Sequence, residues 1–147
     1  MRKIKNEELG RLDVATFKTA NKTPLILVLD NIRSLHNIGS VFRTADAFRV
    51  QEIVLCGITA QPPHKDIHKT ALGATESVSW HYESDSLEAV KILKEKGVEI
   101  IAVEQAEGAQ SLESFDPKPH ITYALVFGNE VKGVDQEVVS RTTGLSK

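Results

Sequence analysis

The sequence of 147 residues contains one cysteine, one tryptophan and no long apolar run. Its single cysteine, Cys56, excludes an intrachain disulfide, and its place in the apolar run 53–56 indicates a small buried side chain rather than a catalytic thiol. The longest apolar runs, 25–29 and 124–127, are far shorter than the roughly 20 residues of a membrane-spanning helix. Because no signal-peptide core follows Met1 either, we expect a cytoplasmic protein without a membrane partner.

Two signatures of nucleotide and nucleic-acid binding are also missing. Neither G-x-x-x-x-G-K-[ST] nor G-x-G-x-x-G occurs, which argues against the usual triphosphate and dinucleotide sites. Basic residues are not in excess, since 18 Lys and Arg stand against 20 Asp and Glu and the net charge is −2. Any contact with a nucleic acid must therefore be local, and the candidates are two basic stretches at 2–5 and 64–69.

From Pro24 onward, short apolar runs rich in β-branched residues alternate with segments of helical periodicity. This alternation predicts strands at 25–29, 52–56, 77–82, 99–103 and 122–127, and helices at 38–48, 66–72, 85–96 and from about 135. Strands that are apolar throughout are typical of a parallel sheet covered by helices on both faces. We therefore expect an α/β fold with a doubly wound, mostly parallel sheet, formed by residues 24–147 after an N-terminal arm at 1–23.

In such a sheet, ligands bind at the carboxyl ends of the strands. The loop after the first predicted strand is rich in polar groups, and its Asn37 could cap the following helix or contact a ligand. Arg43 should emerge beside the buried stripe of that helix, within reach of the strand ends. After the fifth strand, Gly128 permits a close approach to the backbone and Glu130 can accept hydrogen bonds from a ligand, with a simple tight turn as the alternative.

Taken together, these residues resemble two motifs of the SpoU/TrmH branch of the SPOUT methyltransferases, whose fold is an α/β knot. The first is N-x-G-x-x-x-R-T-A-D, which begins at Asn37 and contains Arg43. The second is Phe127-Gly128-Asn129-Glu130 followed by Gly133-Val134, and the segment 69–74 resembles the family's link between the two. The resemblance extends from about residue 25 to residue 139.

The resemblance implies that a methyl group passes from S-adenosylmethionine to a ribose 2′-hydroxyl of tRNA or rRNA, in a homodimeric enzyme. The implied catalytic residues are Asn37, Arg43 and Glu130. The family's arginine is often described as the general base, acting on RNA bound mainly by the partner subunit. A guanidinium with a pKa above about 12 is a poor proton acceptor, so we expect Arg43 to anchor a phosphate and stabilise the developing alkoxide.

Further residues follow from the same resemblance. The family's cofactor site is built largely from backbone groups after the fourth and fifth strands, which here are Val103, Glu104, Gln105, Phe127, Gly128 and Asn129. The predicted RNA contacts are Arg2, Lys3, Arg33, His36, Lys65 and Lys69. His64 and His68 could share a helix face, but no third ligand accompanies them, so we expect no metal site.

The sequence departs from the family at its end, because no third motif with Ser-Leu-Asn precedes Lys147. We therefore expect an incomplete knot, an unpaired strand edge with exposed apolar surface near Val126, Phe127 and Val131, and weak cofactor binding. One alternative is a non-catalytic module of the same fold that binds RNA or protein. A receiver-type signalling domain is another, but it requires several acids after the first strand, where Asp30 stands alone.

Overall fold

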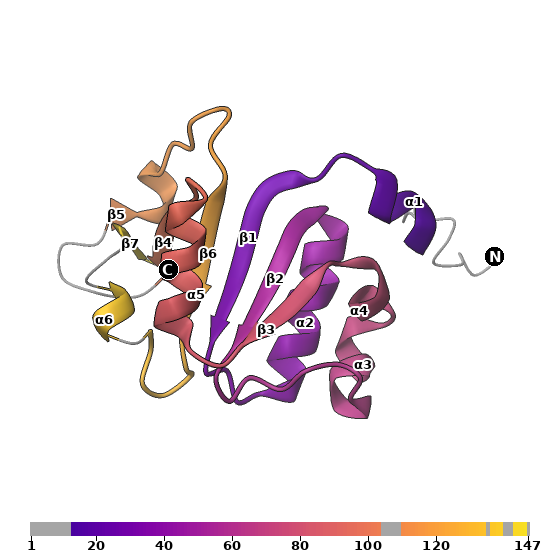
Figure 1. Cartoon of the computed structure of the whole chain (residues 1–147). Coiled ribbons are helices and arrows are strands. Elements are labelled where there is room, and N and C mark those ends of the chain that lie inside the picture. The colour runs from indigo at the N-terminus through magenta and orange to yellow at the C-terminus, as the bar shows by residue number, and fades with distance from the viewer. Residues whose placement is uncertain (1–12, 104–109, 135, 140–142, 147) are drawn as a thin grey trace.

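The computed structural model describes residues 13–103, 110–134, 136–139 and 143–146 (Figure 1). The strands in this part of the chain are β1 (Thr23–Asp30), β2 (Val50–Cys56), β3 (Trp80–Glu83), β4 (Glu99–Val103), β5 (Gln110–Ser111), β6 (Tyr123–Phe127) and β7 (Thr143–Ser146). The helices are α1 (Val14–Thr19), α2 (Leu35–Ala47), α3 (Lys65–Ala71), α4 (Ala74–Ser77), α5 (Ser86–Glu95), α6 (Gln136–Val139) and the short 3₁₀ turn η2 (Leu112–Ser114). The strands form one parallel sheet in the order β3-β2-β1-β6-β4-β7-β5, which confirms the predicted fold class.

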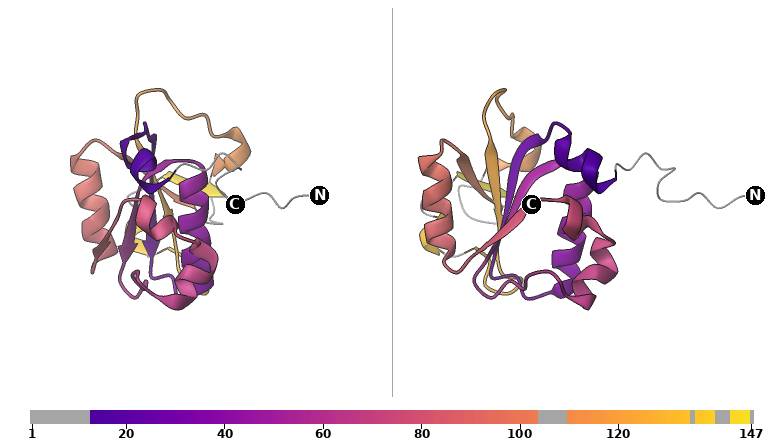
Figure 2. Two further views of the ribbon diagram at one scale, coloured as in Figure 1. Left: turned by 90° about the vertical axis from the view of Figure 1, so that its right-hand side faces the viewer. Right: turned by 45° about the vertical axis from the view of Figure 1, so that its right-hand side comes forward.

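Helices cover both faces of this sheet, as Figures 1 and 2 show. The layer of α2, α3 and α4 lies on one face, and α5 lies on the other. Successive side chains of β1 alternate between the two layers: Leu27 and Leu29 belong to the core cluster beneath α2, whereas Ile26 and Val28 belong to the cluster beneath α5. Because both faces are buried, the strands are apolar throughout, which is the pattern that the sequence shows.

Helix boundaries follow local capping. Asp85 accepts the N–H of Leu87 at the start of α5, and Gly97 adopts φ +82° just beyond its end. Of the two alternatives for Asn37, the helix cap is wrong, because α2 begins earlier: the hydroxyl of Ser34 accepts the N–H of Asn37 at 3.1 Å. The third strand also begins later than predicted, since residues 77 and 78 complete α4 and its cap.

The expected unpaired edge is also wrong for β4. The backbone of β7 runs parallel to β4, with Ile101 opposite Thr143 and Val103 opposite Leu145. Val126 is completely buried rather than exposed. It lies on β6, between β1 and β4, and its side chain belongs to the core cluster beneath α5. Val131 is 81% exposed, as expected. That the knot is incomplete stays a prediction.

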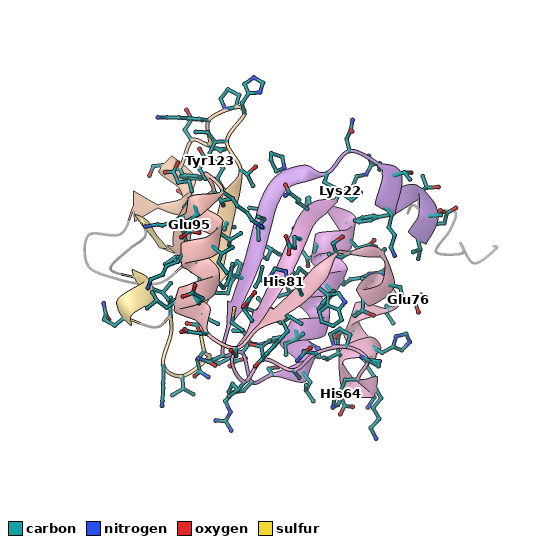
Figure 3. The ribbon with its side chains drawn as sticks, viewed as in Figure 1. Lys22, His64, Glu76, His81, Glu95 and Tyr123 are labelled. Atoms are coloured by element: carbon teal, nitrogen blue, oxygen red, sulfur yellow. The ribbon has the colours of Figure 1, made fainter. Side chains whose placement is uncertain are left out.

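The short helix α1 is attached to the domain through one aromatic side chain. Phe17 is 1% exposed and belongs to the core cluster on the α2 side. The ammonium of Lys22, labelled in Figure 3, lies 4.7 Å from the centre of the Phe17 ring, within the range of a cation–π contact. No helix in the described ranges has the length and apolar character of a membrane span.

Candidate functional site

Three loops meet at the carboxyl ends of β1, β2 and β6, and Asn31 joins them. Its backbone is left-handed, with φ +56°, a conformation that Asn tolerates better than most residues. Its Oδ1 accepts the N–H of Ile58 at 3.0 Å, after β2, and its carbonyl accepts a hydrogen bond from Nδ2 of Asn129 at 2.8 Å, after β6. The sequence analysis did not select Asn31; a short polar residue directly after a buried strand was the available signal.

Glu130 forms the second connection between these loops. Its carboxylate accepts the backbone N–H of Arg33 at 3.1 Å and that of Ser34 at 3.0 Å, just before α2 begins. Partial burial raises the pKa of Glu130, but the hydrogen bonds from Ser34 and Arg33, with smaller contributions from its own backbone and the Asn37 side chain, lower it overall. The carboxylate is therefore charged at neutral pH and fixes the entrance to α2, where the helix dipole also favours a negative group.

The loop that carries Glu130 is folded tightly on itself. Asn129 and Gly133 exchange two backbone hydrogen bonds of 3.0 and 2.8 Å, and the Asn129 side chain accepts the N–H groups of Val131 and Lys132. A Cβ at Gly128 would lie 2.1 Å from backbone atoms of Gly133 and Val134. The close approach that Gly128 permits is therefore that of its own loop, which agrees with the tight-turn alternative rather than with a ligand at this glycine.

A cavity of about 720 Å³ lies beside this loop, at the end of β6 and the start of α2. Its volume is within the range of small-molecule sites. Apolar side chains and the backbone after β6 form one part of its wall, and the polar groups of Asn37, Asn129 and Glu130 form another. The residues that line it are Leu29, Ile32, Asn37, Ser40, Val41, Val103, Phe127, Gly128, Asn129, Glu130, Val131, Lys132 and Gly133. It thus contains two predicted catalytic residues and four predicted cofactor contacts.

The other positions of the first motif have mainly structural contacts. A Cβ at Gly39 would lie 1.9 Å from the Thr70 hydroxyl oxygen and 2.4 Å from the Ile67 carbonyl, so this glycine allows α2 to pack closely on α3. Asp46 is buried and accepts a hydrogen bond of 2.9 Å from the Ser77 hydroxyl. Arg43 is half-buried and does not line the cavity. Its Nη1 is buried and has no hydrogen-bond partner among the residues that the structure describes.

The predicted RNA contacts are divided between two helices. Arg33 and His36 are exposed at the start of α2, and Lys65 and Lys69 are exposed on α3. The Thr70 hydroxyl donates a 3.0 Å hydrogen bond to the His36 carbonyl and so links the two helices. Lys69 also forms an exposed 3.1 Å ion pair within α3. Four predicted site residues lie outside the described ranges: Arg2, Lys3, Glu104 and Gln105.

The remaining candidate groups have ordinary structural environments. His64, labelled in Figure 3, caps α3 by accepting the N–H of Asp66 through Nδ1 at 3.1 Å. No three His, Cys, Asp or Glu side chains come together as metal ligands in the described part of the chain. Burial raises the pKa of the Cys56 thiol to about 12, which agrees with its predicted place in the core.

Comparison with known proteins gives several relatives of one kind. The chain is 27% identical over 128 residues to a 23S rRNA (guanosine-2′-O-)-methyltransferase of Vibrio parahaemolyticus and covers 51% of that protein with 87% of its own length. It is 31% identical over 124 residues to a tRNA (guanosine(18)-2′-O)-methyltransferase of Thermus thermophilus, of which it covers 61% with 84% of its own length. The chain therefore spans about half the length of the first of these relatives and somewhat more of the second.

A solved structure shares the fold of this chain. An rRNA methyltransferase of Sinorhizobium meliloti, solved with S-adenosylmethionine bound, superposes with a TM-score of 0.77 at 24% identity, over 86% of this chain and 47% of the other. The sequence profile of the SpoU rRNA methylase family matches residues 24–147, which is most of the chain and contains both predicted motifs. The chain therefore belongs to the SpoU rRNA methylase family.

Proposed function

We propose that the protein transfers a methyl group from S-adenosylmethionine to the 2′-hydroxyl of a ribose in tRNA or rRNA, in the cytoplasm. The observation that carries this proposal is the contact of Glu130, from the second motif, with the two N–H groups before α2, which carries the first motif. This contact lies beside a cavity of suitable volume. Relatives named as 2′-O-methyltransferases of 23S rRNA and of tRNA support both the reaction and the RNA class.

The cavity fits S-adenosylmethionine in size and chemistry. Leu29, Ile32 and Phe127 offer apolar surface for the adenine ring, and the Asn37 and Asn129 side chains offer polar groups. Val103 and Phe127 end neighbouring parallel strands, so backbone groups of both strands reach the cavity. When bound, the cofactor supplies an electrophilic methyl group on a sulfonium, and the protein contributes binding and orientation.

Glu130 acts in this proposal as a positioning residue. Both of its carboxylate oxygens already accept backbone N–H groups, and the lowered pKa makes the carboxylate a weak proton acceptor. Its contribution is to hold the start of α2, and with it Asn37, against the second motif. Orienting groups in this way can supply several kcal/mol to a bimolecular transfer, of order 7 to 11 in ideal cases.

Arg43 acts on the RNA rather than on the cofactor. It lies outside the cavity that contains Asn37 and Glu130, and its buried Nη1 has no partner in the described part of the chain. Its guanidinium would bind a phosphate and stabilise the oxyanion that forms as the 2′-hydroxyl attacks. Its place outside the cavity supports action on RNA held by a partner subunit.

The RNA surface extends from the start of α2 to α3. Arg33, His36, Lys65 and Lys69 are exposed there, and the hydrogen bond of Thr70 to His36 fixes the two helices relative to each other. Arg2 and Lys3 would add contacts from the N-terminal arm. A local basic surface of this kind agrees with the net charge of −2, which gives no general attraction to RNA.

The functional form would be a homodimer whose interface includes an apolar groove beside α2. An apolar groove of about 340 Å³ runs between α2 and the strands β1 and β6, lined by Leu25, Leu27, Ser40, Val41, Thr44, Phe48, Val50, Leu125 and Phe127. Phe48 at its rim is 68% exposed. A second subunit bound in this groove would bury this apolar surface. It would also place Arg43 near the RNA that the second subunit holds.

Methyl incorporation into total tRNA and rRNA from labelled S-adenosylmethionine tests the proposed function. A 2′-O-methyl group removes the nucleophile of alkaline cleavage, so the labelled product should appear in alkali-resistant dinucleotides. Asn37→Ala should lose most of this incorporation, and Lys118→Ala, changed before β6 at the opposite end of the sheet, should retain it. RNA binding without methyl incorporation, observed also for a chain to which the third motif has been added, would favour the non-catalytic module.

A further inference from the structure

A second cavity, of about 700 Å³, lies across the loop 129–133 from the first. The two share Asn129, Val131, Lys132 and Gly133, so this loop is a common wall. The remaining lining of the second cavity is Asp30, Asn31, Arg33, Ile58, Val134 and Gln136. Val134 belongs to the core cluster on the α5 side, whereas Leu29 and Ile32 of the first cavity belong to the cluster on the α2 side. The two cavities therefore open toward different layers of the fold.

The rim of the second cavity combines positive charge with exposed apolar surface. Arg33 and Lys132 are both exposed, and in the part of the chain that the structure describes neither side chain has a carboxylate or carbonyl partner. Ile58 is 62% exposed and Val131 is 81% exposed. Aliphatic side chains beside free cations are suited to a nucleotide, which presents a flat apolar base and a phosphate on the same ligand.

All four residues at this rim donate a backbone hydrogen bond, that of Val131 to Oδ1 of Asn129. The N–H of Arg33 donates to Glu130, the N–H of Ile58 donates to Oδ1 of Asn31, and the N–H of Lys132 donates to Oδ1 of Asn129. The acceptors are the side chains of Glu130, Asn31 and Asn129, so the backbone of the rim is fixed before any ligand binds. A preorganised rim loses little conformational entropy on binding.

Among the described residues that line this cavity, the one acid is already hydrogen-bonded. Asp30 is 1% exposed and accepts hydrogen bonds from the Ser86 hydroxyl and from Nδ2 of Asn31. Its carboxylate is therefore already hydrogen-bonded to donors of the protein. A phosphate at the rim would meet Arg33 and Lys132 first.

We propose that this second cavity binds a nucleotide of the substrate RNA next to the one that is modified, with its phosphate on Arg33 and Lys132 and its base on Ile58 and Val131. This inference rests on the proposed function, because it assigns to the same RNA a contact separate from the cofactor cavity. Arg33 and Ile58 line only the second cavity, so they separate its role from that of the first.

The test is binding of a fluorescein-labelled single-stranded oligoribonucleotide of mixed sequence, followed by polarisation at several salt concentrations. Arg33→Ala should weaken binding and reduce the slope of log K against log salt by about 0.7, the value for one phosphate contact on a single strand. Ile58→Ser should weaken binding by about tenfold and leave the slope unchanged, since it removes only apolar contact. Lys118→Ala removes a distant positive charge and should change neither quantity.

Unchanged affinity and slope in both Arg33→Ala and Ile58→Ser, with wild-type RNA binding intact, would overturn this inference and leave the proposed function standing. A wild-type chain that binds no RNA would overturn both. AMP binding that depends on Arg33, together with RNA binding that does not, would assign the cavity to a free nucleotide and also overturn the proposal. Calorimetry with S-adenosylmethionine should give equal affinity for the wild type and Ile58→Ser, and a loss in this variant would place Ile58 in the cofactor site instead.

Discussion

The carboxylate of Glu130 accepts the backbone N–H of Ser34, 96 residues earlier in the chain, at 3.0 Å. This hydrogen bond connects the loop after β6 to the first turn of α2, and the parallel bond from Arg33 strengthens the connection. The two family motifs are thus one structural unit, and its integrity can be measured apart from any enzymatic activity.

Glu130→Gln should lower the free energy of unfolding by about 0.5 to 1 kcal/mol at pH 7, because the amide has one acceptor oxygen in place of two and one of the two N–H groups loses its partner; the figure allows for solvent screening at this exposed site. The folded pKa of Glu130 lies below its ordinary value of 4.5. The stabilisation is therefore complete above that value and is lost as the pH falls through the folded pKa. Urea unfolding at neutral and acid pH measures this difference, and an equal difference at both would contradict the assignment.

Gly128→Ala should be more destabilising than Gly97→Ala. At Gly128 the new Cβ would lie 2.1 Å from the backbone of Gly133 and Val134, whereas at Gly97 it meets no atom within 4 Å and only the positive φ is strained. We expect a loss of about 1 kcal/mol for Gly97→Ala and of more than about 2 kcal/mol for Gly128→Ala, measured by urea unfolding. Gly128→Val should also abolish S-adenosylmethionine binding, because the branched side chain would prevent the tight loop beside the first cavity from forming.

Substitutions of Asn31 separate its hydrogen bonds from its backbone conformation. Asn31→Gly removes the bond to Ile58 but accepts the φ of +56°, so it should lower the unfolding free energy by about 1 kcal/mol. Asn31→Ala adds the strain of a left-handed backbone and should cost about 1 kcal/mol more. Equal stability of the two variants would show that the conformation at this residue is relaxed in the folded chain.

Arg43→Lys should reduce methyl transfer by about a hundredfold or more, since one ammonium does not reproduce the planar guanidinium. Because Arg43 does not line the first cavity, S-adenosylmethionine affinity should stay within a few-fold of the wild type. Arg49→Lys, exposed two residues beyond the end of α2, is the matched control and should retain activity. Calorimetry and methyl incorporation together decide this, and a parallel loss of cofactor affinity would place Arg43 in the cofactor site.

The Cys56 thiol should resist labelling in the native protein. Its pKa is raised to about 12 by burial, so almost no thiolate exists at pH 8, and the side chain is completely buried. Reaction with a thiol-specific reagent should then follow the unfolding rate and become complete in concentrated urea. Rapid labelling of the folded chain would show that the carboxyl end of β2 opens locally.

The sequence by itself determined the layer architecture, the buried cysteine and the family, because each depends on periodicity or on the order of motif residues. It located the catalytic candidates Asn37 and Glu130, which the fold brings to one cavity. Only the tertiary structure decided that Gly128 accommodates its own loop, that Gly39 accommodates α3, and that Asn31 joins three loops. These roles depend on contacts between residues that are far apart in the chain, and such contacts exist only after the parallel strands bring their carboxyl ends together at one edge of the sheet.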